Sequence, residues 1–232
     1  MIVLWEILAL IVNKPVILPY PLDVFKAMIA QVSDTGFYMA IGQTVIRMLK
    51  GLVLALALAL ITGMASGLFP AFEQYFSVIS DIIKTVPNVS YIVIILIWLG
   101  SEKSVSAISF FILFPTLYSH ILMGMRSVDH NVYEISLLDN MDIFTRIRVV
   151  HLPYLLPHLF AGIKVSIGLG FKVSIMAEIL GAVRAGIGRE MSVARTYVEM
   201  DQIMAWTVWI IIISLIMDAL FDLIIRKTNT LE

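Results

Sequence analysis

The chain has 232 residues, of which 60% are hydrophobic and 14% charged, and its formal net charge is -1 at neutral pH. This apolar share, with a mean hydropathy of +0.96, exceeds that of soluble domains and favours an integral membrane protein. A nearly neutral chain lacks the basic face that a nucleic-acid partner requires. The absence of cysteine excludes disulfides, thiolate metal sites and a cysteine nucleophile, and no metal-ligand spacing such as HExxH occurs.

The first 48 residues contain one short apolar segment and one surface helix. Met1–Val12 is about half the length of a membrane span and contains Glu6. It fits a clipped or short first membrane helix, an interfacial helix or the tail of a signal segment, and its hydropathy favours the first of these. A cleaved signal peptide is not expected, because no basic n-region or small-residue cleavage site is present. After three prolines, Leu22–Val32 is predicted to form a surface helix.

The rest of the chain contains five apolar segments long enough to cross a bilayer, for which about 20 residues suffice. The expected spans are Leu49–Phe69, Phe76–Leu99, Val105–Met125, Leu155–Leu180 and Met204–Ile225. Ser101–Ser104 is predicted to be a tight turn, and Gly181–Asp201 a longer connection that contains a short polar helix at Arg189–Glu199. With no linker or repeat, the sequence predicts a single all-α transmembrane domain, residues 1–232, with five core helices and a short N-terminal helix.

Two of these spans carry small residues at every fourth position. The first series is Gly51, Ala55, Ala59, Gly63 and Gly67, and the second is Gly162, Ser166, Gly170 and Ser174. Small residues at this spacing let helix backbones approach closely within a membrane. Helix packing is therefore the expected role of the first series. The second series could instead face a partner or a solute path, because ionisable residues lie close to it.

Those ionisable residues are Lys164, Lys172 and Glu178 on the fourth span, with Asp218 and Asp222 on the fifth. A charged side chain inside a span is costly and usually faces protein or water. Lys164 lies near the polar loop and can extend to the interface, so a structural role is expected for it. The candidate residues of a translocation path are Lys172, Glu178, Gly170 and Ser174.

The segment between the third and fourth spans, Val132–Pro157, is amphipathic rather than a plain connector. Its apolar residues recur at near-helical intervals, with charged residues between them. This pattern predicts a helix-turn-helix outside the bilayer that continues into a membrane helix. Such an element suits the docking of another subunit.

The same segment resembles the EAA loop of permease subunits of binding-protein-dependent ABC importers. Glu134-Ile135-Ser136, Asn140 and Val150-His151-Leu152-Pro153 have the spacing of E-A-A, G and I-x-L-P in that loop. Thr44-Val45-Ile46-Arg47 with Gly51 resembles the T-L-x-R-x-x-x-G opening of the family's core domain. Pro153–Gly188, with Ala177-Glu178 and Gly186-Ile187-Gly188, is similar to the nitrate, sulfonate and taurine branch.

The resemblance implies the type I importer permease fold, with a core over residues 44–227 and a coupling loop over residues 128–153. It also implies a multi-pass protein of the inner cell membrane with three protein partners: an ABC ATPase, a second permease chain and an extracytoplasmic binding protein. The chain lacks a GxxxxGK[ST] phosphate loop, so ATP would be bound by the ATPase and no cofactor is expected here. The residues implied in ATPase coupling are Glu134, Ile135, Ser136, Asn140, Met141, Arg146, Leu152 and Pro153.

Asn140 replaces the glycine of the family's loop, and asparagine is the next most tolerant residue for a left-handed turn. The implied solute is a nitrate-, sulfonate- or taurine-like anion or a vitamin precursor, and the second permease chain could be identical or different. A stand-alone secondary carrier or channel is the alternative, in which Lys172 and Glu178 would be coupling groups. An intramembrane enzyme is not supported, because no nucleophile and base are paired in the sequence.

Overall fold

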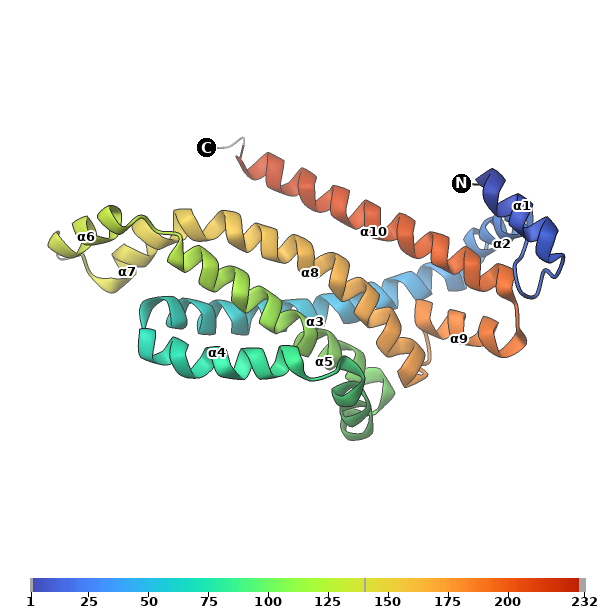
Figure 1. Ribbon diagram of the computed structural model, residues 1–232, viewed down its shortest axis with the longest axis horizontal. Coiled ribbons are helices and arrows are strands. Elements are labelled where there is room, and N and C mark those ends of the chain that lie inside the picture. Colours follow the sequence, from blue (N-terminus) through green and yellow to red (C-terminus); the bar gives the residue numbers. More distant parts are fainter. Residues whose placement is uncertain (1, 140, 230–232) are drawn as a thin grey trace.

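The computed structural model describes residues 2–139 and 141–229, and this part of the chain is helical with no strand. Its long helices are α3 (Thr35–Leu68), α5 (Asn88–Arg126), α8 (Leu152–Gly181) and α10 (Met200–Asn229). They run lengthwise through an elongated bundle, with α6 and α7 at one end and α1, α2 and α9 at the other (Figure 1). Four helical segments in the described residues are long and apolar enough to cross a membrane: Thr35–Leu68, Asn88–Arg126, Ile143–Gly181 and Met200–Arg226.

The two N-terminal helices match the predictions for this region. The short helix is α1 (Ile2–Val12), and Met1 lies outside the described residues. The surface helix is α2 (Pro21–Val32), which starts at a proline. Proline is tolerated at this position because a backbone N–H in the first helical turn would have no acceptor within the helix. Val24 and Ala27 of α2 are buried together with Ala205 of α10.

The predicted span Phe76–Leu99 is wrong as a single helix. The chain forms α4 (Pro70–Thr85), leaves the helical conformation at Val86, and begins α5 at Asn88. Pro87 explains the interruption, because a proline has no N–H and disfavours helical geometry in the residue before it. The predicted turn at Ser101–Ser104 is also displaced, since the chain reverses at Gly100 with φ 71° and ψ 171°.

Small residues hold α3, α5 and α8 together. A Cβ added to Gly51 of α3 would lie 2.6 Å from Ser109 Cβ of α5, so only glycine permits this approach. On α8, a Cβ at Gly162 would meet His120 of α5 at 2.8 Å, and Ser174 is hydrogen-bonded to Ser109 at 2.9 Å. The packing role predicted for the first series is confirmed, and the second series has the same role within this chain.

The polar segment after α5 forms three short elements. They are α6 (His130–Leu138), α7 (Ile143–Arg146) and the π-helical turn η1 (Ile147–His151), which continues directly into α8. The predicted helix-turn-helix is thus confirmed, and it extends beyond the bundle (Figure 1). At the opposite end, α9 (Ile187–Tyr197) begins and ends two residues before the predicted polar helix.

Candidate functional site

The first candidate site is the α6–α7 segment, whose helices are set by local hydrogen bonds. The Asp129 carboxylate caps α6 by accepting a bond from Asn131 N at 2.8 Å. Asp142 caps α7 by accepting bonds from the N–H groups of Phe144 and Thr145, and Thr145 Oγ1 donates to it at 2.6 Å. The hydroxyl bond from Thr145, followed by the backbone bonds, lowers the pKa of the Asp142 carboxyl. The turn therefore keeps an ionised cap at neutral pH.

The outer surface of this segment combines apolar side chains with one carboxylate. Leu138 and Phe144 are 82% and 80% exposed, and Ile135 is also exposed. Glu134 lies beside His130, with Nε2 and Oε1 3.1 Å apart. Large apolar side chains this exposed at the end of a bundle are typical of a contact surface for another protein.

The inner surface of the segment attaches it to α8. Ser136 is fully buried, and its hydroxyl donates to the Tyr133 carbonyl at 2.6 Å. The Arg146 guanidinium lies 5.9 Å from the centre of the Tyr133 ring and donates to the Met141 carbonyl at 3.3 Å. The Tyr133 ring also packs edge-on against His151, at the start of α8.

The remaining predicted coupling residues are divided between the loop and the first turn of α8. Leu152 and Pro153 are exposed where α8 starts. Asn140 lies outside the described residues. Among the predicted coupling residues, Ile135 and Glu134 are thus on the exposed side, whereas Ser136 and Arg146 hold the segment together.

The second candidate site is a charged cluster at the other end of the bundle, formed by the buried residues Thr44, Arg47 and Glu178 and the partly exposed Glu102. The Glu178 carboxylate accepts bonds from Arg47 Nη1 at 2.8 Å, Thr44 Oγ1 at 2.9 Å and Gly188 N at 3.0 Å. The Arg47 and Glu178 side chains are 8% and 0% exposed. Arg47 also forms an ion pair with Glu102, which accepts a further bond from Arg184 N at 2.8 Å.

This cluster ties four parts of the chain together: α3 through Thr44 and Arg47, α5 through Glu102, α8 through Glu178, and the connection that leads to α9. Gly186, at φ 146°, and Gly188 in the first turn of α9 allow this part of the chain to lie against Glu178. A Cβ at Gly188 would lie 2.5 Å from Glu178 Cβ. Sequence reasoning singled out Thr44, Arg47 and Glu178 but missed Glu102 and the pairing itself.

The four predicted path residues of α8 do not share one environment. Gly170, Ser174 and Glu178 are buried within the chain, so their positions give no support to a role in lining a path. Lys172 is exposed and lines a cavity of about 360 Å³ between α8, α9 and α10. Lys164, predicted to be structural, forms a salt bridge with Asp222 of α10, with its Nζ 2.7 and 2.8 Å from the two oxygens.

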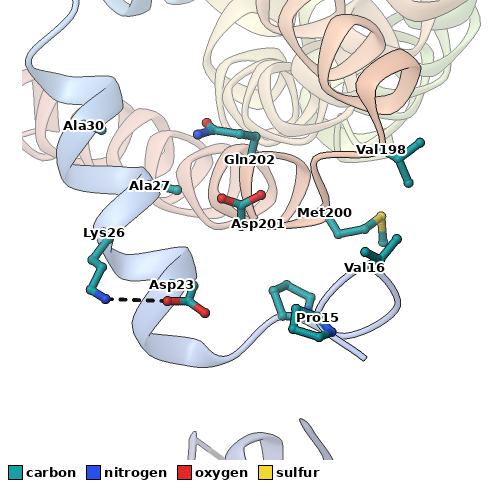
Figure 2. A pocket seen from close by; sticks show the side chains of 11 residues that line it. Pro15, Val16, Asp23, Lys26, Ala27, Ala30, Val198, Met200, Asp201 and Gln202 are labelled. Carbon is teal, nitrogen blue, oxygen red and sulfur yellow. Dashed lines mark ion pairs between the residues drawn. The ribbon is translucent and has the colours of Figure 1, made fainter. Parts of the chain in front are cut away.

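A further cavity of about 510 Å³ lies at the end of the bundle opposite α6 and α7. Figure 2 shows its walls: Asp23 and Lys26 of α2, Asp201 and Gln202 of α10, and Pro15 with Val16 from the segment between α1 and α2. Lys26 and Asp23 form an ion pair at 3.6 Å along the α2 edge of the cavity. This end thus presents a concave surface with both charged and apolar groups.

Comparison with known proteins identifies relatives over nearly the whole chain. The family described as "Binding-protein-dependent transport system inner membrane component" matches residues 51–230. The putative ABC transporter permease protein MJ0413 of Methanocaldococcus jannaschii is 28% identical, over 94% of this chain and 83% of that protein. The putative aliphatic sulfonates transport permease protein SsuC of Bacillus subtilis is 23% identical, over 97% of this chain and 82% of SsuC.

Two further comparisons concern a transport relative and the fold. The taurine transport system permease protein TauC of Escherichia coli is 24% identical, over 92% of this chain and 80% of TauC. Among solved structures, a chain from the crystal structure of an amino acid ABC transporter with histidines superposes with a TM-score of 0.69. That match covers 83% of this chain and 94% of the other at 14% identity, and so shows a shared fold.

Proposed function

Because this chain belongs to the family of binding-protein-dependent transport system inner membrane components, we propose that it forms the solute path of an ABC importer powered by a separate ATPase. The family places the chain in the inner membrane as a transport permease rather than an enzyme. In the proposal, ATP is bound only by the partner ATPase. A second permease chain, identical or different, completes the path, and membrane lipid covers the remaining outer surface.

The observation that carries the proposal is the exposed surface of α6 and α7. Ile135, Leu138 and Phe144 offer apolar contacts to an ATPase, and Glu134 offers a charge beside them. Because η1 joins this segment to α8 without a break, a displacement of α6 and α7 would tilt α8. Closure of an ATPase dimer could in this way alternate the access of the path between the two faces of the membrane.

The solute proposed is a small anion of the sulfonate or taurine kind, because relatives of this chain are permeases for aliphatic sulfonates and for taurine. An extracytoplasmic binding protein would deliver it to the end of the bundle that carries α2, α9 and the cavity of Figure 2. Lys172 is the residue of α8 proposed to contact the solute.

The test is purification of the chain from its native membrane in mild detergent, followed by identification of the proteins that remain bound. We expect an ATPase with a phosphate-binding loop, lost on Glu134→Arg. The matched control is Glu199→Arg, the same charge change on an exposed residue at the opposite end, which should retain the ATPase. Recovery of the chain alone, with solute uptake into liposomes in the absence of ATP, would instead identify a secondary carrier.

A further inference from the structure

A groove of about 560 Å³, lined by both charged and apolar side chains, runs between α4 and α5 beside the segment that was predicted as part of the span Phe76–Leu99. The α4 wall consists of Glu73, Ser77, Asp81 and Lys84, and the α5 wall includes Tyr118, Ser119 and Arg126. Both helices thus present hydroxyl and charged groups to one cavity.

The α4 wall is one continuous polar face of the helix. Residues at positions 73, 77, 81 and 84 lie above one another at helical spacing. The opposite face carries the exposed apolar side chains Tyr75, Ile79 and Ile82. A helix divided in this way has one side suited to lipid or protein and one side suited to water.

Ion pairs follow the groove along its length. Glu73 pairs with Arg126 at the end nearest α6, and Lys84 lies 3.4 Å from Asp81 and 2.9 Å from the Ser119 hydroxyl further along. The Asp81 and Lys84 side chains are 69% and 43% exposed. These two charges are therefore paired but still open to whatever fills the groove.

The depth of Asp81 and Lys84 makes this exposure informative. Phe76 and Ile83 pack α4 against the same apolar core as Leu56 and Leu60 of α3, so α4 lies alongside a membrane span. Lys84 is eleven residues beyond Glu73, which is roughly 16 Å along a helix. We take Glu73, which pairs with Arg126 at the end of α5, as the edge of the hydrocarbon layer. Since half of that layer is about 15 Å thick, this choice places Lys84 near the middle of the bilayer. Exposed charges at that depth need water or another protein beside them.

We propose that the α4–α5 groove is one water-filled wall of the translocation path, separate from the cavity that contains Lys172, with Lys84 and the Ser119 hydroxyl as contacts for a small oxyanion at mid-depth. The assignment rests on the proposed transport function and specifies where the solute passes. Asp81 positions the Lys84 ammonium, and Glu73 with Arg126 forms the charged end of the groove nearest the ATPase. The Lys164–Asp222 salt bridge is about as exposed, at 44% for each side chain, but both Asp222 oxygens already accept bonds from the Lys164 ammonium.

Water access can be measured directly, because the chain has no native cysteine. Single variants Ser77→Cys and Ser119→Cys place a thiol in the groove, and Ile79→Cys and Ile82→Cys place one at similar depth on the apolar face. Each is treated in membranes with the anionic reagent 2-sulfonatoethyl methanethiosulfonate, which reacts with the hydrated thiolate. We expect labelling of the groove positions to be at least about tenfold faster. Equal, slow labelling at all four positions would overturn the proposal, and equal, fast labelling would show that α4 lies at the membrane surface.

The solute contact is tested by uptake into liposomes that contain the whole transporter, with taurine and butanesulfonate as probes. Lys84→Gln should lower ATP-driven uptake of the transported probe about tenfold, as loss of a charged hydrogen bond would, while Lys84→Arg retains most of it. The double variant Asp81→Asn/Lys84→Gln removes both charges and controls for an unpaired Asp81. Normal uptake by Lys84→Gln would overturn the contact.

The labelling result does not depend on transport. Failure of the wild-type transporter to take up either probe with ATP would count against the proposed function, while thiol labelling would still decide whether the groove holds water. Conversely, ATP-driven uptake by the wild type with unreactive groove thiols would overturn the groove alone.

Discussion

Replacement of Arg47 by methionine should destabilise the protein more than any other single charge removal in the buried cluster. Methionine keeps much of the side-chain length but leaves the Glu178 carboxylate, which is 0% exposed, without a cation. Only the bonds from Thr44 Oγ1 and Gly188 N remain to it. Removal of one partner from a buried ion pair costs about 3–5 kcal/mol, since the other charge is left uncompensated.

A loss of this size should be visible as a lower unfolding temperature of the detergent-solubilised protein. At about 2–4 °C per kcal/mol for a chain of this length, the midpoint should fall by about 6–20 °C. Intrinsic fluorescence can follow the transition, because the chain contains four tryptophans. Retention on size exclusion after heating gives an independent measurement.

Two controls separate the buried charge from the loss of packing. Glu102→Gln changes a carboxylate that is 43% exposed, so its cost should stay within about 1 kcal/mol. The double variant Arg47→Met/Glu178→Leu removes both buried charges and should recover a large part of the lost stability. The reasoning is refuted if the double variant unfolds at the same temperature as Arg47→Met, or if Arg47→Met unfolds like the wild type.

Substitutions at Gly188, Asp142 and Lys172 test further features of the structure, two of them against a matched control. Gly188→Ala places a Cβ 2.5 Å from Glu178 Cβ and should lower the free energy of unfolding by about 1–3 kcal/mol. The control Gly42→Ala, whose added Cβ has nothing within 4 Å, should be neutral or stabilising by about 0.5–1 kcal/mol. Thermal unfolding measures both variants. Asp142→Ala removes the α7 cap and should weaken ATPase binding more than Asp142→Asn does. The pKa of Asp142 is lowered in the folded chain, so the stabilising contribution of its charge is present at neutral pH and is lost only as the pH falls through that lowered pKa. Titration of Asp142 should therefore not change ATPase binding between pH 6 and pH 8, which a pull-down at both pH values can measure. Lys172→Met should reduce uptake without reducing recovery of the complex, and unchanged uptake kinetics would make Lys172 a structural residue.

The sequence predicted those features that depend on local pattern. Hydropathy located most spans, because any stretch of about 20 apolar residues can cross a bilayer. The glycine series on α3 predicted close packing, and a Cβ at Gly63 would indeed lie 2.6 Å from Ile121 of α5. The helix-turn-helix was also predictable, because its caps Asp129 and Asp142 are side chains that act on the residues directly after them.

Two kinds of feature were missed: local signals hidden within an averaged hydropathy, and contacts between residues far apart in the sequence. The apolar average over Phe76–Leu99 hid two local signals: the break at Pro87 and the polar face that Asp81 and Lys84 share on α4. A search for polar residues at spacings of three and four would have revealed that face. No such search could pair Arg47 with Glu178, because 131 residues separate them and only the packing of α3 against α8 brings them together.

Charge inside a span is therefore an incomplete indicator of function. Glu178 and Asp81 are both carboxylates beside a cation, and a rule based on residue type and position treats them alike. They differ in what remains accessible: Glu178 is fully enclosed by its donors, whereas 69% of the Asp81 side chain is exposed beside an exposed lysine. An enclosed pair contributes to holding α3, α5 and α8 in place, but it has no surface left for a solute. An exposed charged pair within the bilayer, as proposed for Asp81 and Lys84, must be hydrated or covered by protein. These two residues, rather than Glu178, would therefore require a water-filled space or a second chain beside them.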